Sequence, residues 1–262
     1  MARLQSEIKV AVRQKIIGGA DPLVCVPLLG AKKAVLIDQA KRLRSFSPDL
    51  FEWRVDGYDN VADPADCLAT LGDLRAIIGG IPMILTCRIA SEGGMQPIDS
   101  KTRLALIEAA ISSGLPDIVD IELCNPPTFI RTVQAAAARE GVRLILSYHD
   151  FTHTPDEAFI LDKLEQAQIQ GADIAKVAVM PTDYKDVLTL LNATLKARCT
   201  RLKIPIVTMA MGQAGAVTRL AGGLFGSDIT FAIGDVSSAP GQIPIVDLRR
   251  GMSLLYEGSQ PA

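Results

Sequence analysis

Short apolar, β-branched segments recur along this chain at intervals of roughly 25 to 35 residues, the spacing of repeated strand–helix units. Strands that are apolar on both sides are typical of a parallel sheet covered by helices. Helical patterns lie between most of these segments, at residues 102–113, 127–140, 155–170 and 184–197. Eight apolar segments fit the pattern, at residues 23–28, 50–55, 82–88, 118–123, 143–148, 174–179, 205–211 and 229–233.

Eight strand–helix units in about 250 residues predict an α/β protein with a single (β/α)8 TIM barrel. No linker, low-complexity stretch or charge block divides the sequence, so we expect residues 1–262 to form one domain. Before the first unit, residues 8–12 and 15–17 lie in a short, alternating segment. We interpret them as a small N-terminal β-hairpin that closes the bottom of the barrel.

Local signals predict several helix ends. Thr154, Pro155, Asp156 and Glu157 resemble a helix start with Thr154 as the N-cap, proline in the first turn and acidic residues after it. Glycines at positions 114, 141 and 171 follow helical stretches, where a left-handed residue is favoured.

Composition narrows the class of protein. The formal net charge of −2 gives no basic field for nucleic acid. The N-terminus lacks an apolar core of signal-peptide length, and no apolar stretch reaches membrane-spanning length. Five scattered cysteines form no Cys-x-x-Cys pair. We therefore expect a cytoplasmic protein without nucleic-acid or membrane partners.

In a barrel of this kind, chemistry takes place at the C-terminal ends of the strands. Seven of the eight apolar segments hold or precede polar residues at that position, which packing alone does not explain. These residues are Glu52, Arg54, Asp56, Thr86, Arg88, Glu92, Asp120, Glu122, Ser147, His149, Asp150, Lys176, Thr208, Arg219, Ser238 and Gln242.

Lys176 lies within the apolar run from Ile174 to Met180. A buried ammonium group is costly unless it is paired or loses its proton. Desolvation lowers the pKa of a lysine, and a neutral amine attacks carbonyl groups. Lys176 is therefore a candidate for Schiff-base formation. The alternative is a structural lysine that pairs with a carboxylate or extends to solvent.

His149 ends the strand-like segment one unit before Lys176, so the two side chains should approach each other in a barrel. Histidine suits general acid–base catalysis near neutral pH. Glu92 could orient His149 and stabilise its charge. The alternatives are a structural imidazole and an ordinary loop carboxylate. His153 lies in a loop before a helix, and we expect it to be structural or solvated.

Other charged residues have two interpretations. Glu52, Arg54 and Arg88 could bind a polyhydroxylated acid or form a structural ion network. Asp120 and Glu122 should share one face of their strand, where Lys176 and the arginines would have to balance them. Arg219 is the best candidate to clamp a substrate carboxylate.

The sequence offers little for a metal or a cofactor. The two histidines are not at metal-binding spacing, and the cysteines do not cluster. Neither glycine-rich nucleotide-binding motif is present. We expect no metal and no cofactor, with the lysine amine as the electron sink.

Taken together, the motifs resemble the type I 3-dehydroquinate dehydratases over nearly the whole chain. They include Glu52-Trp53-Arg54-Val55-Asp56, Arg88 with Glu92-Gly93-Gly94, and Ser147-Tyr148-His149-Asp150-Phe151. They continue with Lys176-Val177-Ala178-Val179-Met180-Pro181, Met209-Ala210-Met211-Gly212, Arg219-Leu220, Phe225-Gly226-Ser227 and Ser238-Ala239-Pro240-Gly241-Gln242. Their joint order and spacing are far more specific than any single motif.

The resemblance implies a lyase that dehydrates 3-dehydroquinate to 3-dehydroshikimate in the shikimate pathway, which supplies chorismate and the aromatic amino acids. It implies a homodimer, an imine at Lys176, His149 as general acid and base, and Glu92 as its partner. It also implies a lid at residues 234–242 and apolar residues Met209 and Met211 near the imine. The implied substrate-binding residues are Glu52, Trp53, Arg54, Arg88, Arg219, Ser238 and Gln242. Pro27 departs from the family, because some relatives carry a hydroxyl residue there.

The same residues leave two other functions open. Another Schiff-base barrel, such as a class I aldolase, would cleave carbon–carbon bonds and commonly act on phosphorylated sugars. A sensor would bind a quinate-like acid without turning it over. The combination of Lys176, His149 and Glu92 argues against a sensor, because binding alone needs no buried nucleophile.

Overall fold

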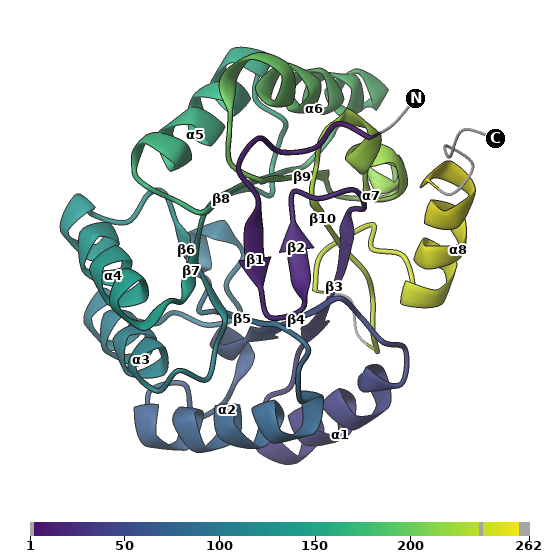
Figure 1. The fold of residues 1–262 in the computed structure, drawn as a ribbon. Coiled ribbons are helices and arrows are strands. Elements are labelled where there is room, and N and C mark those ends of the chain that lie inside the picture. Colours follow the sequence, from purple (N-terminus) through teal and green to yellow (C-terminus); the bar gives the residue numbers. More distant parts are fainter. Residues whose placement is uncertain (1–2, 236–237, 257–262) are drawn as a thin grey trace.

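The computed structural model describes residues 3–235 and 238–256, and within them eight parallel strands form a nearly closed barrel surrounded by eight α-helices (Figure 1). This confirms the predicted (β/α)8 architecture. The barrel strands are β3 (Leu23–Leu28), β4 (Leu50–Arg54), β5 (Met83–Thr86), β6 (Ile118–Glu122), β7 (Arg143–Asp150), β8 (Ile174–Val179), β9 (Ile206–Ala210) and β10 (Ile229–Phe231). The predicted strand ends differ from these by at most two residues.

The α-helices lie outside the barrel and alternate with its strands along the chain. They are α1 (Lys33–Arg44), α2 (Pro64–Ile78), α3 (Ser100–Ser112), α4 (Pro127–Glu140), α5 (Glu157–Ile169), α6 (Tyr184–Lys196), α7 (Ala216–Ala221) and α8 (Ile245–Tyr256). Short helical turns are η1 (Val55–Gly57), η2 (Ala90–Glu92), η3 (Ala197–Arg201) and η4 (Gly222–Phe225). None of the described helices is both long and apolar enough to cross a membrane.

The barrel closes between β9 and β10, where one backbone hydrogen bond and several side-chain contacts take the place of a regular hydrogen-bond ladder. Strands β3 to β9 pair in chain order and β10 pairs with β3. The amide of Asp228 donates to the Ile206 carbonyl at 2.7 Å, and its carboxylate accepts from the Ile206 amide at 2.8 Å. Ser227 Oγ accepts from the Thr208 amide at 3.0 Å. These contacts satisfy backbone groups that would otherwise be buried without partners.

Alternate residues of each strand face the barrel interior and the helix layer. In β8, Ala175, Val177 and Val179 pack in the cluster beneath the helices. Ile174 and Ala178 pack in the separate interior cluster, and Lys176 lies between them in sequence. Because side chains alternate along a strand, Lys176 must face the interior. The polar residues at even positions of β4 and β6 face inward for the same reason.

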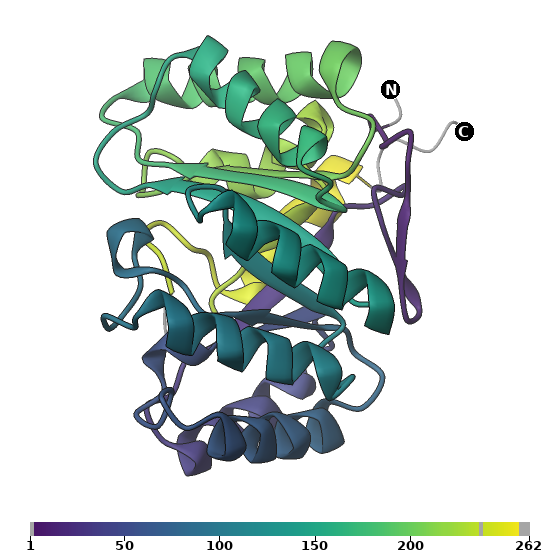
Figure 2. The same cartoon turned by 90° about the vertical axis from the view of Figure 1, so that its left-hand side faces the viewer.

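The hairpin of β1 (Val10–Val12) and β2 (Lys15–Ile17) covers one end of the barrel (Figures 1 and 2). Val10, Val12 and Ile17 pack against the apolar interior residues near the starts of the strands. The bottom of the barrel is thus an apolar plug, which confirms the predicted hairpin and its position. Polar interior residues are confined to the opposite end.

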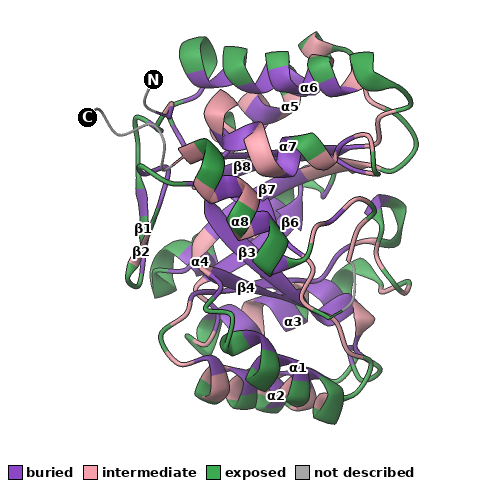
Figure 3. Cartoon of the chain, turned by 90° about the vertical axis from the view of Figure 1, so that its right-hand side faces the viewer, coloured by how far each residue is buried: buried purple, intermediate pink, exposed green. Residues whose placement is uncertain are grey.

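Each helix buries the face that lies on the sheet and exposes the other (Figure 3). Positive φ angles at Gly114, Gly141 and Gly171 confirm the predicted left-handed residues after helices. The predicted N-cap of α5 is wrong. Asp156, not Thr154, caps this helix by accepting a hydrogen bond from the Phe159 amide at 2.8 Å. A carboxylate adjacent to the first turn can reach the free amide that the more distant hydroxyl cannot.

Candidate active site

A cavity opens among the C-terminal ends of the strands. Ten of the twelve predicted site residues line it, which brings together side chains from β4, β7, β8 and β9 with three loops. The lining residues are Glu52, Arg54, Arg88, Glu92, His149, Phe151, Lys176, Ala178, Met209, Met211, Phe231, Ser238, Ala239 and Gln242.

Lys176 faces this cavity and is also paired. Its Nζ donates to Asp120 Oδ2 at 2.7 Å and lies 3.8 Å from Glu52 Oε1. The aromatic ring of Phe231 lies 4.6 Å from the same nitrogen, measured to the ring centroid. The lysine is only 4% exposed. The sequence suggested either a reactive lysine at a cavity or a structural lysine paired with a carboxylate. Lys176 has both features, because it pairs with Asp120 and borders the cavity.

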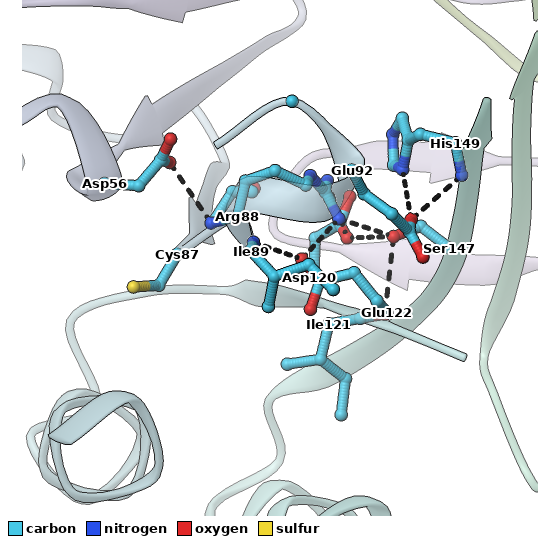
Figure 4. A network of polar contacts seen from close by, with 12 residues as sticks. Asp56, Cys87, Arg88, Ile89, Glu92, Asp120, Ile121, Glu122, Ser147 and His149 are labelled. Atoms are coloured by element: carbon cyan, nitrogen blue, oxygen red, sulfur yellow. Dashed lines mark hydrogen bonds and ion pairs between the residues drawn. The ribbon is translucent and has the colours of Figure 1, made fainter. Parts of the chain in front are cut away.

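His149 and Glu92 meet in the geometry expected of an oriented base (Figure 4). His149 Nδ1 lies 3.1 Å from Glu92 Oε2, and the His149 amide donates to the same oxygen at 2.9 Å. Burial, followed by the cationic Arg88 and Lys176, holds the pKa of His149 well below its usual range. The imidazole is therefore neutral at pH 7 and able to accept a proton.

Glu92 lies in η2, in a loop with little contact with water. Burial raises the pKa of Glu92 to about 7, although Arg88 opposes this effect. Gly93 follows with a φ of 86°, and the ring of Phe151 occupies the space where a Cβ atom would be. Phe151 in turn stacks on His149, with 6.5 Å between the ring centroids. A glycine at position 93 thus allows Phe151 to cover the histidine–glutamate pair.

Arg88 joins two buried carboxylates on β6 (Figure 4). It lies 2.9 Å from Asp120 Oδ1 and 2.9 Å from Glu122 Oε1, and it donates to Ser147 Oγ at 2.7 Å. Burial opposes ionisation of Asp120, but Arg88 and Lys176 together hold its pKa well below the usual range. The expected balance between the carboxylates, Lys176 and the arginines is therefore confirmed, because these charges neutralise one another inside the barrel.

Glu52 and Arg54 alternate along β4 and both reach the cavity. Glu52 accepts a hydrogen bond from Thr86 Oγ1 at 2.8 Å. Arg54 forms two parallel bonds with Asp56, at 2.9 and 2.8 Å. Thr86 and Asp56 thus hold Glu52 and Arg54 in place. The two charged side chains can therefore present hydrogen-bonding atoms to a ligand without rearrangement.

Arg219, from α7, lies immediately behind the lining. It is 2% exposed, and its guanidinium donates to the carbonyls of Phe231 and Pro240 at 3.3 and 3.1 Å. Within the described residues it forms no ion pair with a carboxylate, and its buried Nε has no hydrogen-bond partner. Burial lowers its pKa to about 10. Arg219 is thus a buried cation at the edge of the cavity with unused capacity to bind an anion.

The loop after β10 covers the cavity with residues that bind each other. The Ser238 amide donates to Gln242 Oε1 at 2.8 Å, and Gln242 Nε2 donates to Ser238 Oγ at 2.9 Å. Pro240 anchors the loop by accepting from the Gly212 amide at 3.1 Å. Within the predicted lid of residues 234–242, Val236 and Ser237 lie outside the described residues.

The structure corrects one predicted contact. Trp53 was expected to bind substrate, but it is fully buried in the cluster beneath the helices and packs edge-on against Tyr58 at 5.8 Å. Strand alternation explains the error, because Glu52 and Arg54 face inward and the residue between them must face outward. Pro27 is buried but is not among the cavity residues.

Sequence reasoning also missed part of the lining, namely Phe151, Ala178, Phe231 and Ala239. Ala178 could have been found, because it lies two residues after Lys176 on the same strand face. His153 is as expected: its ring lies 3.0 Å from Asp150 and its side chain is 59% exposed. In the described part of the chain, no group of three histidine, cysteine or acidic side chains is arranged to hold a metal ion.

Comparison with known proteins agrees with this geometry. Residues 24–259 match the family described as type I 3-dehydroquinase. A 3-dehydroquinate dehydratase of Geobacillus thermodenitrificans is 44% identical over 252 residues, which cover 96% of this chain and 97% of the relative. A second, from Shouchella clausii, is 47% identical over 89% of this chain and 91% of its own length.

Solved structures show the same similarity. The 3-dehydroquinate dehydratase of Geobacillus kaustophilus superposes with a TM-score of 0.94 at 45% identity, covering 97% of this chain and 99% of the other. The type I enzyme of Clostridium difficile, solved with covalently modified comenic acid, superposes with a TM-score of 0.93 at 38% identity, covering 96% and 98%. The chain therefore belongs to the type I 3-dehydroquinase family.

Proposed function

We propose that this protein is a lyase that dehydrates 3-dehydroquinate to 3-dehydroshikimate through a Schiff base at Lys176. The observation that carries the proposal is the placement of Lys176 and His149 in one cavity, with Glu92 behind the histidine. Membership of the family supports the substrate. The reaction belongs to the shikimate pathway.

The covalent step begins at the lysine. Lys176 Nζ attacks the C3 ketone of the substrate, and loss of water leaves a cationic imine. This imine withdraws electrons from the neighbouring C2 more strongly than the ketone does, so the C2 proton becomes easier to remove. The protein's own amine thus acts as electron sink, and the proposed chemistry uses no added cofactor.

His149 then performs the proton transfers. Its neutral imidazole removes the C2 proton, and the electrons move toward the imine nitrogen. The imidazolium formed in this step is stabilised by Glu92 and returns the proton to the departing C1 hydroxyl. Because one imidazole serves both positions, proton and hydroxyl leave from the same face, which is a syn elimination. Water finally releases the product from Lys176.

Substrate binding follows from the charges that line the cavity. The substrate carboxylate needs a cation, which Arg219 can supply from the edge of the cavity. Its hydroxyl groups need the hydrogen-bonding set of Glu52, Arg54 and Arg88. Ser238 and Gln242 would close over the bound substrate and exclude water.

Mass spectrometry of the protein after addition of 3-dehydroquinate and borohydride tests the proposal. We expect a reduced adduct on the peptide that contains Lys176, together with the ultraviolet absorbance of the enone product. Consumption of substrate without an adduct would contradict the imine route. Neither adduct nor consumption would contradict the proposed substrate.

Two alternatives give different results in the same assay. A class I aldolase would cleave a carbon–carbon bond and release two carbon fragments, and its activity would depend on a phosphate group of the substrate. A sensor would bind 3-dehydroquinate and leave it unchanged. The homodimer and the cytoplasmic location stay predictions.

Arg219→Ala should weaken substrate binding selectively. A charged hydrogen bond of this kind is worth about 1.5–3 kcal/mol, so we expect KM for 3-dehydroquinate to rise roughly 10- to 100-fold. Affinity for an analogue without the carboxylate should change little, and both can be measured by calorimetry. Equal losses for the two ligands would contradict the carboxylate clamp.

The pH dependence of turnover should report Glu92. Its pKa is about 7, so below this pH the carboxyl is protonated and cannot stabilise an imidazolium on His149. Above it the carboxylate is present. We therefore expect kcat to rise about tenfold as the pH increases through 7, the change that one pKa unit of differential interaction would give. Glu92→Gln should remove this rise in a profile from pH 5 to 9, and an unchanged profile would contradict the assignment.

A further inference from the structure

Asp120 is the carboxylate closest to the reactive nitrogen, and both of its oxygens are in use. Oδ2 accepts from Lys176 Nζ at 2.7 Å. Oδ1 lies 2.9 Å from Arg88 Nη2 and accepts from Ser147 Oγ at 2.6 Å. Asp120 is 1% exposed and lies beneath the cavity rather than in its lining. Arg88 and Ser147 therefore orient the carboxylate through Oδ1, while Oδ2 holds the lysine.

We propose that Asp120 is the counter-ion of the covalent intermediate: it positions Lys176 Nζ for attack and then accepts a hydrogen bond from the iminium N–H. This inference rests on the proposed function, because it deepens the role of the same site. It assigns a positioning and charge-stabilising part to a residue that does not line the cavity.

The charge balance of imine formation explains why an anion that stays ionised beside the lysine nitrogen would stabilise both the reactant and the imine. An ammonium group and a ketone give an iminium ion and one molecule of water, so the nitrogen carries one positive charge before and after the step. Two nitrogen protons leave with the carbonyl oxygen as water, and one N–H remains. A carboxylate that stays in place can pair with the nitrogen in both states without moving.

Asp120 suits this role better than Glu52 does. Glu52 is 3.8 Å from Lys176 Nζ, and the same oxygen, Oε1, accepts a hydrogen bond from Thr86. Asp120 is 1.1 Å closer and is held by Arg88 and Ser147. With two cations beside it, Asp120 remains ionised and does not take up the proton that catalysis moves.

Five ionisable side chains surround Lys176 on the neighbouring strands and on the loop after β5. They are Asp120 itself and Cys25, Glu52, Arg88 and His149. A test of Asp120 must keep the last four unchanged. A single substitution that removes only the charge of Asp120 leaves the other four in place.

Asp120→Asn is that substitution, because it keeps the shape of the side chain. In single-turnover experiments with saturating 3-dehydroquinate and borohydride, we expect the trapping rate at Lys176 to fall about 100-fold, as for a misplaced reacting group. KM should change much less. A wild-type trapping rate in Asp120→Asn would overturn the inference.

Two further variants separate positioning from folding. Ser147→Ala removes one hydrogen bond to Asp120 but no charge, and we expect a smaller fall of about threefold to tenfold in the same rate. Asp228→Asn removes another buried carboxylate between two arginines, Arg3 and Arg198, outside the cavity. Per folded molecule, we expect Asp228→Asn to trap at the wild-type rate. If Asp120→Asn does not fold, an unchanged rate in Ser147→Ala overturns the inference.

A measurement without substrate distinguishes this inference from the proposed function. Cyanate carbamylates neutral amines, so its rate at Lys176 can be followed at one fixed pH by peptide mass spectrometry. We expect faster carbamylation of Lys176 in Asp120→Asn, because the ammonium form loses the carboxylate that pairs with it. No substrate adduct in the wild type would contradict the proposed function, while faster carbamylation would still show that Asp120 acts on the lysine. An unchanged carbamylation rate would overturn the counter-ion role even where the enzyme is active.

Discussion

Lys176→Ala is expected to abolish the covalent adduct and to lower turnover of 3-dehydroquinate by roughly 10³-fold or more, the scale seen when a nucleophile is removed. The reason is chemical, because no other amine within the described residues lines the cavity. Without the imine, the C2 proton is activated only by the ketone. The adduct is measured by mass spectrometry after borohydride reduction, and turnover by absorbance of the enone.

Lys203→Ala is the matched control, because its side chain is 64% exposed and lies outside the cavity. It should keep both adduct and activity. Loss of Lys176 also leaves Asp120 and Glu52 without their shared cation, so Lys176→Met, which keeps most of the volume, should be measured beside it. A reduced adduct that persists in Lys176→Ala would place the nucleophile elsewhere.

His149→Ala is expected to have the opposite effect on the adduct. Removing a general acid–base group typically lowers the rate about 10²- to 10⁴-fold. Lys176 keeps its partners Asp120 and Glu52, so the imine should still form at least in part. With the following proton transfer blocked, it should accumulate. Rapid quenching with borohydride should therefore trap more adduct than in the wild type, while product formation is slow.

The chain offers a natural control for this experiment in its other histidine. His153 is exposed and pairs with Asp150 at the rim, so His153→Ala should leave turnover and adduct level unchanged. Absence of the imine in His149→Ala, together with a full imine in Lys176→Ala, would reverse the two assigned roles.

Much of the fold could be predicted because it depends on local pattern. The apolar segments matched the barrel strands to within two residues, since a strand buried on both sides needs a continuous apolar sequence. The hairpin was predicted from two short segments before the first strand–helix unit, and its buried residues Val10, Val12 and Ile17 pack on the barrel interior. Helix ends depend on which oxygen reaches a free amide, and there the choice of Thr154 over Asp156 was wrong.

The site was predicted in outline and corrected in detail. The position of the strand ends was enough to bring Lys176, His149 and Glu92 to one cavity. Trp53 was assigned to the cavity with its motif, although strand alternation turns it outward. Arg219 was predicted as a site residue. Its place behind the lining, with no carboxylate partner among the described residues, depends on the packing of α7 against β9 and β10.

The sequence by itself determined that the chain forms a barrel and that its reactive groups gather at one end of it. Both follow from periodicity, which acts between residues close together in the chain. Only the tertiary structure decided how the buried charges pair, with Asp120 on Lys176 and Glu92 on His149. The energy of such pairs depends on distances of a few ångströms between separate segments in a dry interior, and the order of residues does not specify these distances.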